Sequence, residues 1–419
     1  MRYLYTFLFY LAMPFVFLRL IWRSRKLRDY RLRLGERLGF YPFKLEKCIW
    51  VHAVSVGEVI AAIPLIKSLQ AQYPGMPMLV TTMTPTGAVR VKAAFGEKVH
   101  HAYLPYDLPG AINRFLKAMQ PKVCVIMETE LWPNMLVGCR KHNIPVCLTN
   151  ARLSEKSAGG YQRIAPLTRE MLGNLSSISA CGEADADRFE ALGAKAKQMA
   201  ITGNLKFDLV LPKELPDRCA ALRKELGENR FTWIAASTHE GEEEIILDAH
   251  AKLLEVDPTA LLILVPRHPD RFDEIAELAE SRFKTTRRST GNSVMPDTAV
   301  YLGDTMGEML LMYGASDVAF VAGSLIPRGG HNILEPAALS KPILTGIHLF
   351  NFAEISNKFL NAGALIKVND AENLAARLIN FLEDKDDRDV HGRRARDVMD
   401  ANRGALAKQI DVIQQVMRG

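Results

Sequence analysis

The stretch Ile49-Trp-Val-His-Ala-Val-Ser-Val-Gly-Glu58 decides the fold, because an apolar, β-branched run passes directly into the start of a helix. A short apolar run bounded in this way predicts a buried strand. The runs Met78–Thr82, Val123–Met127 and Pro145–Thr149 repeat the pattern. Because strands that alternate with helices form parallel sheets, the sequence predicts a doubly wound α/β unit.

The same alternation returns after residue 230, in Phe231–Ala236, Ala260–Val265, Asp317–Ala322 and Pro342–Thr345, with a helix expected over Glu243–Leu254. Two doubly wound halves are therefore expected, with a linker near 207–220, where two prolines interrupt any periodicity. Ligands of such folds bind at the carboxyl ends of the strands, so a central crevice is expected between the halves. We place the boundaries at 1–25 for an anchor and the start of a basic collar, 26–210 and 211–400 for the two α/β domains, and 401–419 for a C-terminal helix.

Composition limits the classes to which this chain of 419 residues belongs. With 48% apolar and 24% charged residues it is typical of a globular protein, not of a disordered or multi-span membrane protein. Its six cysteines form no C-x-x-C pair, as expected of reduced core residues in the cytoplasm. The net charge of +6 resides in residues 19–37, and the balanced remainder argues against a nucleic-acid binder.

The segment Tyr3–Leu18 carries no charge and continues to Trp22 if the Arg19 side chain extends toward the headgroups. About 20 apolar residues suffice to cross a bilayer, so we interpret it as an anchor that spans the membrane or, because it contains Pro14, lies in one leaflet. A cleaved signal peptide is disfavoured, because only Arg2 precedes the run and no small-x-small site follows. Basic residues stay on the cytoplasmic side, so the bulk of the chain is expected there. The basic collar consists of Arg19, Arg23, Arg25, Lys26, Arg28, Arg31, Arg33 and Arg37.

The first motif, His52-Ala-Val-Ser-Val-Gly-Glu58, lies where a strand ends and a helix begins. Gly57 is expected to permit a tight turn, and Glu58 to project into the crevice from the first helical turn. There Glu58 is a candidate general base if burial or a nearby carboxylate raises its pKa. The alternative is a glutamate that caps the helix. His52 is interpreted as a hydrogen-bonded strand residue.

The second motif, Met127-Glu-Thr-Glu-Leu-Trp-Pro-Asn134, follows another buried strand. Glu128 and Glu130 can face the same side of an extended segment. If one of them lies near Glu58, its negative charge would raise the pKa of Glu58. Trp132 offers a flat face for a sugar ring. The alternative is a solvated loop with two acids.

Two basic residues complete the first half. Lys206, in Gly203-Asn-Leu-Lys-Phe-Asp208, lies between the halves and is able to meet an anionic substrate. Arg152, which follows another strand, is a candidate clamp for a carboxylate or phosphate. A surface lysine is the alternative for Lys206.

The second half places four polar loops after its strands, at 236–241, 266–269, 304–309 and 323–336. In the last of these, Gly329 and Gly330 are expected to open a helix whose N–H groups receive phosphate, with Glu335 one turn further in to take ribose hydroxyls. The loop is neither G-x-G-x-x-G nor a P-loop, so a nucleotide-sugar site remains. For a metal ion, Asp185-Ala-Asp187 is the one weak candidate pair, interpreted as an acidic first helical turn.

With these residues in place, the chain resembles the 3-deoxy-D-manno-octulosonic acid (Kdo) transferases of Gram-negative bacteria, which are inverting enzymes of the GT-B architecture. The resemblance rests on an anchor with basic residues after it and on eight motifs in the family's order: HAVSVGE, ETELWPN, NARLS, GNLKFD, ASTHEGEE, PRHP, GDTMGEM and GSLIPRGGHNILEP. It implies CMP-Kdo as donor, a lipid A precursor as acceptor, no metal ion or other cofactor, and work at the inner membrane. It further implies that Glu58 is the general base, assisted by Glu128 and Lys206.

The resemblance and the loop chemistry together assign the remaining candidates. The first domain is expected to bind the acceptor and the second the nucleotide sugar. Acceptor or sugar contacts are expected from Ser55, Gly57 and Arg152. Nucleotide contacts are expected from Arg267, His268, Met306, Gly307, Glu308, Met309, Gly329, Gly330, His331, Asn332 and Glu335. The alternatives are an epimerase or a transferase for another nucleotide sugar, and a noncatalytic membrane-tethered binder of nucleotides or lipids.

Overall fold

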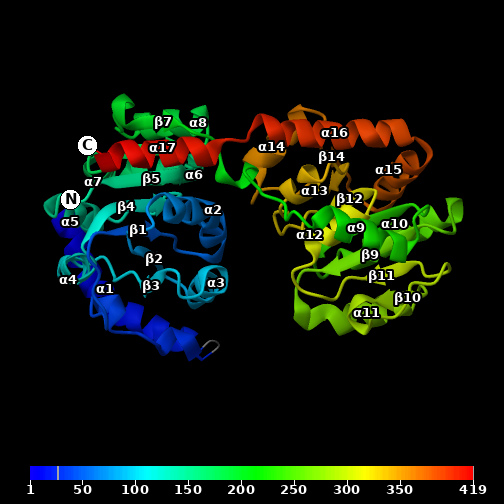
Figure 1. The fold of residues 1–419 in the computed structure, drawn as a ribbon, viewed down its shortest axis with the longest axis horizontal. Helices are drawn as coiled ribbons and strands as arrows, with labels where there is room; N and C mark the ends of the chain where they lie inside the picture. The colour runs from blue at the N-terminus through cyan, green and yellow to red at the C-terminus, as the bar shows by residue number, and fades with distance from the viewer. Residues whose placement is uncertain (26–27, 419) are drawn as a thin grey trace. The chain divides into compact units, whose positions relative to one another are not determined.

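The computed structural model describes residues 1–25 and 28–418, which divide into two compact units (Figure 1). The first unit comprises Met1–Asp208 and the chain from Arg403 onward, and the second comprises Leu209–Asn402. Of the basic collar, Lys26 lies outside the described residues, and so does the side chain of Arg28.

In the first unit the described residues form a seven-stranded parallel sheet in the order β3-β2-β1-β4-β5-β6-β7. The four predicted strands are its β1, β2, β4 and β5, whose residues are almost all buried because helices cover both faces. The strands are β1 (Cys48–His52), β2 (Met78–Thr82), β3 (His100–Tyr103), β4 (Pro121–Met127), β5 (Val146–Ala151), β6 (Ser177–Ala180) and β7 (Met199–Ile201). The helices are α1 (Arg2–Arg23), α2 (Val56–Gln72), α3 (Pro85–Phe95), α4 (Pro109–Met119), α5 (Pro133–Lys141), α6 (Glu155–Arg163), α7 (Ala165–Leu172), α8 (Glu183–Ala191) and α17 (Ala405–Arg418).

In the second unit the described residues again form a seven-stranded parallel sheet, in the order β10-β11-β9-β8-β12-β13-β14. The predicted strands are β8, β9, β12 and β13, and the prediction of two doubly wound α/β halves is confirmed. The strands are β8 (Thr232–Thr238), β9 (Leu261–Pro266), β10 (Thr285–Arg287), β11 (Val300–Leu302), β12 (Val318–Val321), β13 (Ile343–Thr345) and β14 (Ile366–Lys367). The helices are α9 (Leu215–Leu226), α10 (Glu243–Val256), α11 (Phe272–Glu280), α12 (Met309–Ala315), α13 (Leu334–Ala338), α14 (Ala353–Asn361), α15 (Ala371–Glu383) and α16 (Lys385–Ala401).

The last helix, α17, is part of the first unit, beside the sheet that the N-terminal half of the chain builds (Figure 1). Its residues Ala405, Ile410 and Ile413 are buried in the core that also contains β1 and α2. The two carboxylate oxygens of Asp208 accept hydrogen bonds from the backbone N–H groups of Gly404 at 2.7 Å and Leu406 at 2.5 Å. The first unit is therefore built from two parts of the sequence, and the whole second unit lies between them.

By length and composition α1 is able to cross a membrane, with a mean hydropathy of 1.8, and it is the one such helix among the described residues. It is not isolated from the first unit. Met13 is buried in a cluster with Tyr106 and Leu108, which precede α4, and with Ala111 in its first turn. Most of its other large apolar side chains are exposed.

The basic collar does not face outward as a whole, because Arg37 is buried, whereas Arg33 stays exposed but is also paired. Arg37 is 2% exposed and donates to the carbonyl of Met83 at 3.1 Å. Its guanidinium lies 4.6 Å from the ring centroid of Tyr103. Arg33 pairs with Glu36 at 2.6 Å. Both arginines hold the chain after α1 against the sheet.

Candidate active site

Glu58 is the third residue of α2, and its side chain folds back onto the start of that helix. Its Oε2 accepts from the N–H of Val54 at 2.8 Å, and its Oε1 accepts from the N–H of Ser55 at 3.2 Å and from Ser55 Oγ at 2.8 Å. Ser55 Oγ in turn accepts from the N–H of Glu58, which completes a capping box. Glu58 is thus a capping residue, as the alternative interpretation held, but Oε2 keeps a lone pair for a proton.

Gly57 does not make the tight turn that we expected. It lies inside α2 with no left-handed φ, and a Cβ placed on it would come no closer than 3.9 Å to Ser55 Oγ. The turn from β1 into α2 is made by Ser55, which has extended backbone angles typical of a helix cap.

Three carboxylates gather near this helix start. Burial raises the pKa of Glu58 to about 7, and the negative charges of Glu130 and Glu128 add to the rise against the opposing hydrogen bonds. Burial also raises the pKa of Glu130, with Glu128 contributing. Glu128 itself adopts a left-handed φ of 57°, a strained conformation for a non-glycine residue that is enriched at functional sites. The predicted proximity of Glu58 to the second motif is therefore present.

A buried asparagine near the end of β5, Asn150, contacts the loop after β7. Asn150 Oδ1 accepts from the N–H of Leu205 at 2.9 Å, next to Lys206. The Nδ2 atoms of Asn150 and Asn204 are buried and have no hydrogen-bond partner among the described residues. Arg152 and Lys206 are half-buried on the loops after β5 and β7 respectively. These asparagines, which the sequence analysis did not single out, supply donors beside the predicted basic residues.

Two aromatic side chains of the motifs serve the fold. His52 is fully buried, with Nδ1 at 2.9 Å from Thr81 Oγ1, and burial lowers its pKa to about 4. Its interpretation as a strand residue is confirmed. Trp132 is partly buried and packs against the core of the first unit, and that its remaining exposed surface stacks on a sugar stays a prediction.

In the second unit three histidines meet at the ends of β8, β9 and β12. His239 Nε2 lies 2.9 Å from His331 Nε2, the two rings stack at 5.1 Å, and the His268 ring lies 5.3 Å from that of His239. Burial lowers the pKa of His331 to about 4, with contributions from His239 and the cation Arg267. Burial also lowers the pKa of His239, with Arg328 and Arg267 among the neighbours that add to the shift. A cluster of this kind favours an anion.

The glycine-rich loop has a different local structure from the one predicted. Gly329 and Gly330 do not open a helix, because α13 begins only at Leu334. Both glycines have left-handed φ values, and the N–H of Gly330 donates to the carbonyl of Gly323 at 2.7 Å. A Cβ on Gly323 would lie 2.8 Å from the His331 ring. The glycines therefore fold the loop back over the histidines, so the prediction that they open a helix is wrong, whereas binding of a phosphate by this loop stays a prediction.

Glu242 organises this loop, and the sequence analysis missed it inside the ASTHEGEE motif. Its carboxylate is fully buried and accepts from the backbone N–H groups of Gly323 at 2.7 Å, Ser324 at 2.9 Å and Leu325 at 2.9 Å. A fourth N–H, that of His239, donates at 3.2 Å. One carboxylate thus joins the loop after β8 to the loop after β12.

The remaining nucleotide candidates lie on two neighbouring segments. Asn332 Nδ2 donates to Glu335 Oε1 at 3.3 Å, and burial raises the pKa of Glu335. Glu308 is held by Arg288 at 3.1 Å, whereas Met306 on the same loop is 68% exposed. That these residues bind a nucleotide stays a prediction.

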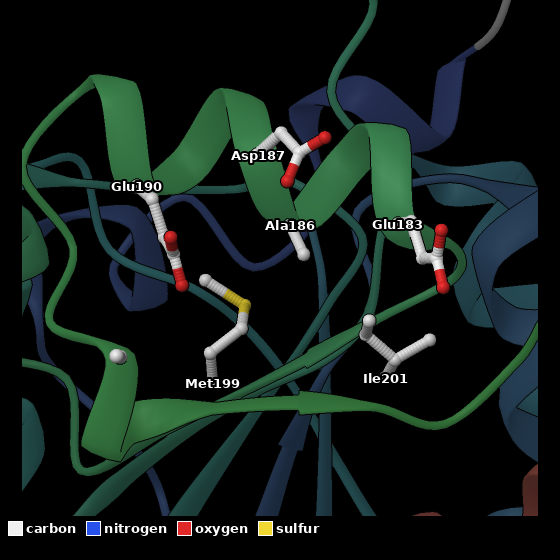
Figure 2. Close-up of a pocket in the computed structure, with 7 residues that line it drawn as sticks. Glu183, Ala186, Asp187, Glu190, Met199 and Ile201 are labelled. Atoms are coloured by element: carbon white, nitrogen blue, oxygen red, sulfur yellow. The ribbon is translucent and has the colours of Figure 1, made fainter.

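The acidic pair on α8 does not form a chelating site. Asp185 accepts from the N–H of Leu153 at 2.8 Å inside the unit, whereas Asp187 borders a surface hollow of about 450 Å³ between α8 and β7. Figure 2 shows Glu183 and Glu190 pointing from α8 toward the strand. Among the described residues no three histidine, cysteine, aspartate or glutamate side chains converge as metal ligands.

Comparison with known proteins gives matches along the whole chain. Residues 32–209 match the family described as 3-deoxy-D-manno-octulosonic-acid transferase (kdotransferase), and residues 244–398 match glycosyl transferases group 1. The chain is 44% identical, over 99% of its length and 98% of the relative's, to a 3-deoxy-D-manno-octulosonic acid transferase of Haemophilus influenzae. It is 36% identical to that of Bordetella pertussis, over 91% of this chain and 90% of the relative.

Among solved structures, the chain is similar to the UDP-GlcNAc 2-epimerase of Neisseria meningitidis, with a TM-score of 0.60 at 14% identity, over 88% of this chain and 100% of that one. It is also similar to a glycosyltransferase of Rickettsia africae, with a TM-score of 0.57 at 15% identity, over 89% and 99% of the two chains. At this level of identity the likeness shows a shared fold of two Rossmann-like units.

Proposed function

The chain belongs to the 3-deoxy-D-manno-octulosonic acid (Kdo) transferase family of lipopolysaccharide biosynthesis, and from that premise we propose that it moves Kdo from CMP-Kdo onto a lipid A precursor. We place this reaction at the cytoplasmic side of the inner membrane. The observation that carries the proposed chemistry is Glu58, a buried carboxylate whose pKa of about 7 suits proton abstraction at neutral pH.

The transfer is a direct displacement. The acceptor hydroxyl gives its proton to Glu58 as its oxygen forms a bond to the anomeric carbon of Kdo. The bond from that carbon to the phosphate oxygen of CMP breaks, and the electron pair leaves with CMP. Because the acceptor attacks from the face opposite the leaving group, the configuration inverts. Glu128 and Lys206 assist the transition state, and Ser55, Gly57 and Arg152 contact the acceptor or the sugar.

The cytidylate is assigned to the second unit. The histidine and arginine cluster around His331 offers positive charge and N–H donors to the phosphate, and the loop of Gly329 and Gly330 covers it. Asn332 and Glu335 take the ribose or the phosphate. Protein groups thus meet the charge of the leaving group, so we propose that turnover needs no metal ion and persists in EDTA.

A noncatalytic binder of nucleotides and lipids is the competing function, and release of CMP separates the two. We expect the purified chain to release CMP from CMP-Kdo over time when the lipid acceptor is present, and far more slowly without it. A chain that binds both ligands but releases no CMP would be the binder. The product's anomeric configuration, measured by NMR, is expected to be opposite to that of the donor.

Membrane association is proposed through residues 3–37, and the collar carries a prediction. Replacing Arg23, Arg25, Lys26 and Arg28 by glutamine is expected to loosen binding to vesicles that contain anionic lipid, because each basic residue near such a surface contributes about 1 kcal/mol. The loss relative to the unmodified chain is expected to be largest at low salt and to shrink as salt screens the charges, and cosedimentation at low and high ionic strength measures it. The matched control is Arg37→Gln, since Arg37 is buried. Full retention of the collar variant in dilute and strong salt alike, equal to that of the unmodified chain, would refute the prediction.

A further inference from the structure

The helix α1 is attached to the first unit along one complete face. Its partly or fully buried residues recur every three or four positions, which is the spacing of one side of a helix. They are Arg2, Tyr5, Thr6, Phe9, Ala12, Met13, Val16, Phe17 and Leu20.

The beginning of α1 is held by polar contacts to folded parts of the first unit. Arg2 donates to Asn134 Oδ1 at 3.1 Å and lies 3.3 Å from a carboxylate oxygen of Glu170. Asn134 Nδ2 donates to Thr6 Oγ1 at 2.9 Å. The backbone N–H of Asn134 donates to the buried Asp107 carboxylate at 2.9 Å, so this anchoring point is itself fixed.

The end of α1 lies on the same unit. The ring of Phe17 packs edge-on against Tyr106 with centroids 6.0 Å apart, and Leu20 is 7% exposed. Directly after the helix, Arg31 Nε donates to Ser24 Oγ at 2.6 Å. A helix of 22 residues is about 33 Å long, close to the thickness of the hydrocarbon layer of about 30 Å. Spanning would therefore carry Arg2 and its partners to the opposite leaflet, which is incompatible with two ends bound to one folded unit.

The outward face of α1 is apolar and bordered by positive charge. Arg19 and Arg23 are exposed beside it. A second copy of the chain on this face would bring like charges together, whereas anionic headgroups complement them. The exposed large apolar residues are Tyr3, Leu4, Phe7, Leu8, Tyr10, Leu11, Phe15, Leu18, Ile21 and Trp22.

We infer that α1 does not cross the bilayer but lies in the plane of one leaflet, with its inner face docked on the first unit and its outer face among the acyl chains of anionic lipid. The inference rests on the proposed membrane association and adds its geometry. It places Asn134, at the end of the loop that carries Glu128, within the docking contact, so the membrane surface and the candidate active site share one structural element.

Labelling of a thiol at the N-terminus of α1 tests on which side of the membrane this end of the helix lies. A cysteine inserted between Met1 and Arg2 of the full chain is treated with a membrane-impermeant maleimide in inverted inner-membrane vesicles. The control is Lys92→Cys on α3, an exposed site of the same unit, and the six native cysteines are buried. We expect both thiols to be labelled equally before detergent is added. Labelling of the N-terminal thiol only after detergent would show a spanning helix and overturn the inference.

Depth measurement gives a second, independent readout. Tryptophans introduced singly by Leu4→Trp and Phe15→Trp, which lie on nearly the same side of the helix, are quenched by lipids brominated at different depths, with Trp22→Phe as the common background. An in-plane helix gives both tryptophans the same depth, whereas in a spanning helix Leu4 lies about 9 Å further from the middle of the bilayer than Phe15. If the chain does not cosediment with vesicles at all, or forms a dimer through this face instead, membrane association itself is wrong. Unequal depths with full vesicle binding would contradict only the in-plane geometry.

Discussion

Glu58→Gln is expected to lower kcat by about 10³-fold while leaving the affinity for CMP unchanged, because it removes the proposed base. The N–H groups of Val54 and Ser55 donate to different oxygens of Glu58, so the amide keeps one of these two contacts and loses the other, and a lower melting temperature is expected with the loss of rate. Steady-state kinetics with CMP-Kdo and the lipid acceptor measure the loss, and calorimetric titration with CMP supplies the control. Turnover equal to that of the unmodified chain would remove Glu58 from the mechanism.

The pH dependence of the same reaction tests whether Glu58 is the base. A base must be deprotonated, so the rate is expected to rise as pH increases through about 7, the pKa of Glu58. Glu130→Gln removes a negative charge that raises this pKa, so the pKa falls and the acidic limb moves to lower pH. Glu183→Gln, on α8, is expected to leave the limb in place. A limb that moves to higher pH in Glu130→Gln would contradict the coupling.

Glu242→Gln is expected to damage the nucleotide site more than any other isosteric change in the second unit. An amide has one acceptor oxygen, and its NH₂ group would face backbone N–H donors of Gly323, Ser324 or Leu325. Each buried donor left without an acceptor costs about 1–3 kcal/mol. We expect at least a tenfold weaker affinity for CMP, since 1.4 kcal/mol corresponds to about a factor of ten. A lower melting temperature is expected with it.

Two measurements separate positioning from general damage to the fold. Glu244→Gln, an exposed neighbour on the same helix, is expected to bind CMP normally. In Glu242→Gln the KM for CMP-Kdo is expected to rise more than kcat falls, because the reacting groups around Glu58 are unchanged. Normal CMP affinity in Glu242→Gln would show that the contact between the two loops does not shape the nucleotide site.

The central strands were predictable from the sequence and the edge strands were not. β1, β4, β8 and β9 are continuous apolar runs because helices cover both faces of each sheet. β3 and β10, at the sheet edges, consist of His100-His-Ala-Tyr103 and Thr285-Thr-Arg287, which are short and polar. Pairing with a neighbouring strand forms them, and no local pattern records that pairing.

The candidate site was predictable only in part, for a similar reason. That Glu58 follows a strand and starts a helix is visible in the chain, but its capping contacts depend on the side-chain conformation. The function of Glu242 depends on a loop more than 80 residues away, so no spacing reveals it. The number of collar residues that face outward was overestimated, because counting charges does not show that Arg37 turns inward against Tyr103.

The most direct test of the central claim is transfer itself. The membrane-extracted chain is incubated in EDTA with CMP-Kdo freshly generated in the mixture and a tetraacylated lipid A precursor, and the mass of the lipid product is followed. We predict a product heavier by one or more Kdo residues. No heavier lipid in EDTA or in magnesium, with CMP-Kdo synthesis verified, would contradict the account, and a product that requires magnesium would contradict its metal independence.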